Sequence, residues 1–124
     1  MINILVVDDE LSISKMLKKI LTSYGYRVTT MNNGNDALEA FRKTPDKFDL
    51  VVSDMTMPKM TGLQLASEIR AIKADFPIIV CSGFSDQIKV KDPNKLGISL
   101  FIEKPISSAN IALAVRKVLE KNSI

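Results

Sequence analysis

Short apolar runs that suit buried strands alternate with segments of helical periodicity along the chain, and this alternation limits the possible folds more than any other feature. The strand-like runs cover residues 3–7, 26–31, 50–52, 77–81 and 98–102. Between and after them, apolar residues recur at the three- and four-residue spacing of an amphipathic helix. The alternation predicts an α/β fold, a doubly wound parallel sheet with helices on both faces.

Local signals give the expected ends and inner faces of the helices. Gly25 should close the first helix, and Asn33-Gly34 reads as a turn before a second helix at 36–43. Ser107 or Ser108 is the expected cap of the last helix. The residues expected to face the sheet are Leu65, Ala66, Ile69 and Ile72 in the third helix, and Ile111, Ala114, Val115, Val118 and Leu119 in the last.

Composition narrows the classes of function. A chain of 124 residues with 46% hydrophobic content suits a single domain spanning 1–124. Its net charge of +3 comes from scattered basic residues, which favours a solvated surface over nucleic-acid binding. The absence of histidine excludes a Ser-His-Asp triad and a histidine zinc site.

The cysteine content and the absence of long apolar segments in the sequence indicate the cellular compartment of the protein. Cys81 is the only cysteine and lies in an apolar run, so it reads as a small core residue and an internal disulfide is excluded. No signal pattern or membrane-spanning apolar stretch is apparent in the sequence. We therefore expect a cytoplasmic protein.

Polar side chains follow four of the five predicted strands. Asp8 and Asp9 follow the first strand, Asp54 the third, Ser82 the fourth and Lys104 the fifth. Ligands of doubly wound sheets bind beyond the carboxyl ends of the strands, so these side chains should meet at one site. Taken alone, Asp54 would more often be a helix cap or turn residue.

The joint placement of these side chains indicates phosphoryl chemistry. Three neighbouring carboxylates would repel one another unless a cation lay among them, and Mg²⁺ prefers such oxygen ligands. Lys104 and Ser82 could contact phosphoryl oxygens. Because the chain has no histidine, Asp54 is the expected nucleophile, and its attack would give an acyl phosphate.

This set of residues resembles the receiver domain of two-component response regulators over essentially the whole chain. The residues that carry the resemblance are the acidic pair Asp8-Asp9, Asp54 within DMTMPKMTG, the hydroxyl residue Ser82 and the pair Lys104-Pro105. It implies a five-stranded flavodoxin-like sheet of order 2-1-3-4-5, with Asp54 as phosphoacceptor. It also implies Mg²⁺ bound by Asp9, Asp54 and the backbone carbonyl of Thr56, with Asp8 acting mainly through a coordinated water.

The same resemblance implies a conformational switch. Ser82, Lys104 and the backbone amide of Gly83 would contact the phosphoryl group, and Phe101 would turn as Ser82 moves. This would change the face made by the family's fourth helix (about residues 85–96), fifth strand and fifth helix. Phe101 reads equally well as an ordinary core aromatic. Lys104-Pro105 matches a cis peptide of the family, although trans is the default for any X-Pro bond.

A receiver of this kind takes its phosphoryl group from a sensor histidine kinase, a histidine phosphotransfer protein or a small donor. It would not be an enzyme beyond self-catalysed phosphorylation and dephosphorylation. We expect it to act on an unknown downstream protein, to bind neither nucleic acid nor membrane, and to be a monomer or a weak phosphorylation-linked dimer.

Several alternatives remain open at the level of sequence. The residues that follow Ser82 and the run at 92–97 depart from common receivers, so the fourth helix could be truncated, and a receiver excised from a hybrid sensor kinase fits as well. A haloacid-dehalogenase-type phosphatase would need an acid at Thr56. A flavodoxin-like electron carrier would need a phosphate loop where the acids stand. A phosphorylation-independent interaction module would usually have lost an acid or the lysine.

Overall fold

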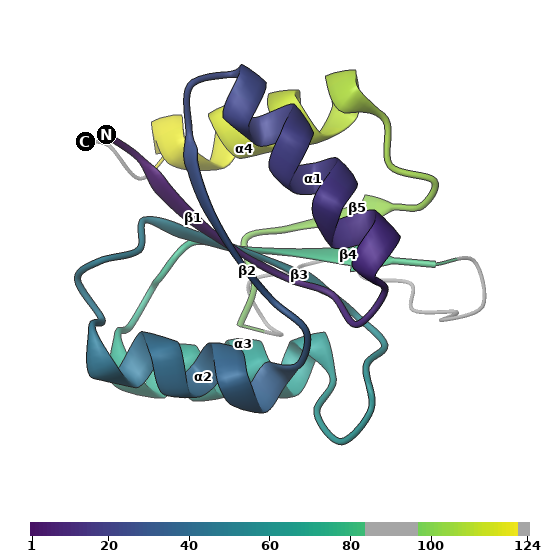
Figure 1. Cartoon of the computed structure of the whole chain (residues 1–124). Helices are drawn as coiled ribbons and strands as arrows, with labels where there is room; N and C mark the ends of the chain where they lie inside the picture. Colours follow the sequence, from purple (N-terminus) through teal and green to yellow (C-terminus); the bar gives the residue numbers. More distant parts are fainter. Residues whose placement is uncertain (84–96, 122–124) are drawn as a thin grey trace.

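The computed structural model describes residues 1–83 and 97–121, which form one parallel sheet covered by helices on both faces (Figure 1). The five strands have the order β2-β1-β3-β4-β5. Their bounds are β1 Asn3–Val7, β2 Arg27–Met31, β3 Leu50–Asp54, β4 Ile78–Ser82 and β5 Leu100–Glu103. The predicted fold class and strand order are confirmed.

Four helices of the described part cover the sheet, two on each face. Helices α1 (Leu11–Ser23) and α4 (Ser108–Lys121) pack on one face. Helices α2 (Gly34–Lys43) and α3 (Gly62–Ile72) pack on the other, as Figure 1 shows. None of the described helices is long and apolar enough to cross a membrane.

Each face of the sheet has its own apolar core, because successive side chains of a strand point to opposite faces. In β1, Leu5 and Val7 join the core under α2 and α3, whereas Ile4 and Val6 join the core under α1 and α4. All four are completely buried. The unbroken apolar strands are therefore explained by burial on both sides.

The helix ends follow from short-range hydrogen bonds. The side chain of Asn33 accepts from the backbone N–H of Asp36, so α2 already begins at Gly34 and the turn predicted at these residues is instead the start of the helix. Thr61 and Gln64 form a capping box at the start of α3. Ser107 Oγ accepts from the backbone N–H of Asn110 and caps α4.

Two further predictions can be judged against the described residues. Leu65, Ala66 and Ile69 are buried as expected, but Ile72 is 40% exposed, so its predicted inward position is wrong. Ile72 is the last residue of α3, so its exposure depends on where the helix ends rather than on the helical spacing alone. The predicted fourth helix, at about residues 85–96, lies outside the described residues.

Candidate functional site

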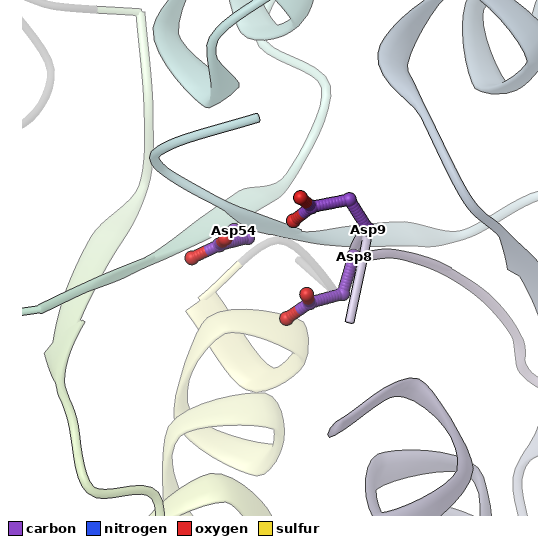
Figure 2. Close-up of side chains that lie close together, drawn as sticks. All are labelled: Asp8, Asp9 and Asp54. Carbon is purple, nitrogen blue, oxygen red and sulfur yellow. The ribbon is translucent and has the colours of Figure 1, made fainter. Parts of the chain in front are cut away.

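Three carboxylates gather at the carboxyl edge of the sheet (Figure 2). Asp8 and Asp9 directly follow β1, and Asp54 is the last residue of β3. β1 and β3 are paired neighbours, with Val7 opposite Ser53, so the two chain segments end side by side. One ligand oxygen from each of Asp8, Asp9 and Asp54 lies within 4.8 Å of the others.

Two of the three carboxylates are buried, and burial controls their protonation. Asp8 is 1% exposed and Asp54 is 7% exposed, whereas Asp9 faces solvent. Burial raises the pKa of Asp8 to about 6, although the backbone N–H of Glu10 donates to its Oδ1 at 2.9 Å and opposes this effect. Burial also raises the pKa of Asp54, and the contact with Lys104 opposes that rise.

Lys104 brings a cation into this site. Its Nζ lies 2.7 Å from Asp54 Oδ1. Burial alone would lower the pKa of Lys104, but the hydrogen bond and the charge of Asp54 raise it above its ordinary value. The backbone N–H of Lys104 donates to the Ser82 carbonyl at 2.8 Å, and the following Lys104–Pro105 peptide bond is cis.

The other residues singled out in the sequence lie on the neighbouring strands and loops. Ser82 ends β4, one residue beyond Cys81, which pairs with Asp54, and the Ser82 hydroxyl donates to the Gly83 carbonyl at 3.4 Å. Thr56 is exposed in the loop after β3. Phe101 is half-buried and packs against the core under α2 and α3.

The loop from β3 to α3 is held by a close contact that the sequence did not predict. The backbone N–H of Gly62 donates to the Met55 carbonyl at 2.8 Å. A Cβ atom on Gly62 would overlap the Asp54 carbonyl oxygen, so the start of α3 packs directly on the backbone of the candidate site. A glycine at the start of a helix, a few residues after a site residue, is the available signal for such an approach.

The charges of the cluster suit a hard divalent cation. When all are ionised, three carboxylates and one ammonium leave two uncompensated negative charges at a partly buried site. Carboxylate oxygens from two adjacent chain segments can ligate Mg²⁺ while leaving positions for other oxygen ligands. The donor set of Asp8, Asp9 and Asp54 therefore fits this ion. A carboxylate that lies beside an ammonium group and two further carboxylates has the surroundings in which a carboxylate can take part in metal-assisted phosphoryl transfer.

Comparisons with known proteins agree with this geometry. Residues 4–116 match the response regulator receiver domain family. The chain is 38% identical over 116 residues to the chemotaxis protein CheY of Thermotoga maritima. That alignment covers 93% of this chain and 95% of the CheY protein. It also spans about half of some longer curated relatives.

Two solved structures extend the comparison to three dimensions. A response regulator receiver domain protein from Clostridium thermocellum aligns with a TM-score of 0.91 at 27% identity, covering 98% of this chain and 96% of that chain. The response regulator TrrA of Thermotoga maritima, crystallised in complex with Mg²⁺-BeF, aligns with a TM-score of 0.84 at 35% identity. That alignment covers 96% of this chain and 100% of TrrA.

Proposed function

The chain belongs to the response regulator receiver domain family of two-component signal transduction, and on that premise we propose that Asp54 is the residue that accepts the phosphoryl group. The observation that supports this assignment best is the environment of its carboxylate. Asp54 is buried at the sheet edge, 2.7 Å from the Lys104 ammonium and clustered with Asp8 and Asp9. Among the described carboxylates, the pairing with Lys104 is particular to Asp54.

The proposed transfer is a displacement at phosphorus. A carboxylate oxygen of Asp54 attacks the phosphorus atom, the bond from phosphorus to the donor breaks, and the electron pair of that bond leaves with the donor. Lys104 loses its contact with the attacking carboxylate and follows the phosphoryl oxygens, whose charge it stabilises. Asp54 is held in place by the backbone of β3, so little rearrangement of the main chain is needed.

The carboxylate cluster around Asp54 would also provide a site for Mg²⁺. Asp9, Asp54 and the backbone carbonyl of Thr56 would hold the ion directly, and Asp8 would act through a coordinated water. When bound, the ion neutralises charge on the phosphoryl oxygens. This is the cofactor that we propose, on the support of the carboxylate cluster.

Ser82, Gly83 and Phe101 are proposed to read the phosphorylated state. The Ser82 hydroxyl would leave the Gly83 carbonyl and donate to the phosphoryl group, which adds about 1.5 to 2 negative charges if the values for phosphoserine apply. Movement of Ser82 would make room for the Phe101 ring. This would shift the balance between two conformations of the surface that includes β5 and α4.

We further propose the setting in which this chemistry occurs. The family accepts phosphoryl groups and is not a conventional enzyme, so the protein's own catalysis would be limited to its phosphorylation and dephosphorylation. The donor would be a phosphohistidine of a sensor kinase or phosphotransfer protein, in the cytoplasm. The same roles hold for a single-domain receiver, monomeric or weakly dimeric, and for a receiver within a hybrid kinase.

The test is phosphorylation by a small acyl phosphate donor with Mg²⁺, measured by intact-protein mass spectrometry. The wild type should gain one phosphoryl group and Asp54→Asn none. Asp46→Asn is the matched control, because Asp46 is an exposed aspartate whose partner is Lys73, and it should label like the wild type. Full labelling of Asp54→Asn would overturn the assignment. Labelling in excess EDTA would overturn the proposed role of the metal.

A further inference from the structure

A second charged site lies at the opposite end of the sheet from the carboxylates. Arg70 of α3 and Lys117 and Lys121 of α4 line a hollow of about 440 Å³ at the start of β5. Helices α3 and α4 cover opposite faces of the sheet (Figure 1). The lining therefore draws its cations from elements on both sides of the edge strand β5. Asp75 is the only acid among the described lining residues. Within the described lining of the hollow, called the cation pocket below, positive charges exceed negative charges by two.

Two hydrogen bonds fix the Arg70 guanidinium and use only part of its N–H donors. Its Nε donates to the Phe76 carbonyl at 3.1 Å, and its Nη2 donates to Ser99 Oγ at 3.3 Å. A guanidinium has five N–H donors, so these two bonds leave three for another acceptor. Burial lowers the pKa of Arg70 and the charge of Asp75 opposes this shift, although no carboxylate of the described residues lies close enough to form an ion pair with Arg70. A fixed, partly desolvated guanidinium of this kind suits the oxygens of a phosphate or carboxylate.

The two lysines increase the positive charge of the cation pocket. Lys117 and Lys121 are one helical turn apart on α4, a spacing at which like charges repel each other. On the same helix, Arg116 pairs with Glu120 at 3.0 Å, whereas neither lysine forms an ion pair with any residue that the structure describes. A bound anion would relieve the repulsion among the three cations.

Charge and size together select the anion. A single carboxylate would leave the pocket positive, whereas a phosphate monoester carries about 1.5 to 2 negative charges at neutral pH. Leu100 and Val118 add apolar surface to the lining, and the volume lies within the range of small-molecule sites. We propose that the cation pocket binds the phosphate group of a small organic phosphate ester, with the organic part against Leu100 and Val118.

The test is an NMR titration of the whole metal-free chain in EDTA with adenosine monophosphate. The expected result is saturable shifts of the backbone amides of Arg70, Ser99 and Leu100, with Kd below about 1 mM. Inorganic phosphate should bind the same residues more weakly, because it lacks the apolar part. A tetraglutamate peptide should bind more weakly still.

Two double variants that each remove two positive charges distinguish binding in the cation pocket from nonspecific attraction of the anion to a basic protein. Lys117→Gln with Lys121→Gln should weaken binding about tenfold. Lys15→Gln with Lys18→Gln, on exposed positions of α1, should leave it unchanged. Equal losses in both variants, or no saturation by about 10 mM, would overturn the proposal. Tighter binding of the peptide would overturn the ligand class, and equal binding of inorganic phosphate would overturn the role of Leu100 and Val118. These outcomes do not depend on whether Asp54 accepts a phosphoryl group.

Discussion

Replacing Asp8 with asparagine is expected to stabilise the metal-free protein at neutral pH. The Asp8 side chain is 1% exposed, and burial raises its pKa from the ordinary value of 3.8 to about 6. Above this pH the folded protein holds a buried carboxylate in the neighbourhood of Asp54 and Asp9. Asparagine has nearly the same shape, keeps an oxygen that can accept from the Glu10 N–H, and carries no charge.

The magnitude follows from proton linkage. Because the folded state holds the Asp8 proton more tightly than the unfolded state, the stability due to this group is fully present below about pH 4. It is lost as the pH rises through about 6, the pKa in the folded protein. The difference between the two pKa values corresponds to about 3 kcal/mol at pH 7.5, and to about half of that at pH 5. Asp8→Asn should recover these amounts.

The assay is urea unfolding in EDTA, followed by circular dichroism at the two pH values. Asp46→Asn, which changes an exposed aspartate, is the control and should stay within about 0.5 kcal/mol of the wild type at both. A destabilised Asp8→Asn protein at pH 7.5, or a stabilisation that does not shrink at pH 5, would refute the explanation based on burial of the charge.

Four other outcomes are expected. Gly62→Ala should lower the free energy of unfolding by about 2 kcal/mol, since the new Cβ overlaps the Asp54 carbonyl; an unchanged urea midpoint would contradict this close contact. Lys104→Gln leaves the Asp54 carboxylate without its cation and should cost about 1–3 kcal/mol at pH 7.5, a loss that an equal stability curve would disprove. Millimolar Mg²⁺ should raise the Tm at pH 7.5 but not at pH 5, where protons compete for Asp8; a pH-independent rise would place the ion elsewhere. Burial raises the pKa of Cys81 to about 12, so a thiol reagent should label it only after unfolding in urea, and rapid labelling of the native protein would contradict its burial.

The position of the carboxylate cluster could be predicted because two simple constraints act together. Apolar residues buried on both faces mark parallel strands, and parallel strands bring their carboxyl ends to the same edge. The charged residues within two positions of the ends of the first, third and fifth apolar runs include Asp8, Asp54 and Lys104, and the shared sheet edge brings these three together. The structure places Nζ of Lys104 against Asp54 without any of the three being adjacent in sequence.

Features that depend on precise packing could not be predicted in the same way. The approach of Gly62 to the Asp54 carbonyl depends on the path of a whole loop, which the identity of one glycine does not determine. Ile72 has the spacing of an inner residue, yet its exposure depends on where α3 ends. The cation pocket joins residues of α3, β5 and α4, whose convergence has no counterpart in local sequence.

The most direct test of the central claim is to locate the phosphoryl group chemically. The protein would be treated with a small acyl phosphate donor and Mg²⁺, reduced with borohydride, digested and sequenced by mass spectrometry. Reduction of an aspartyl phosphate converts that residue to homoserine, and the account predicts homoserine at position 54 and at no other aspartate. Homoserine at another position, or a phosphoryl group on serine or threonine with Asp54 unchanged, would contradict it.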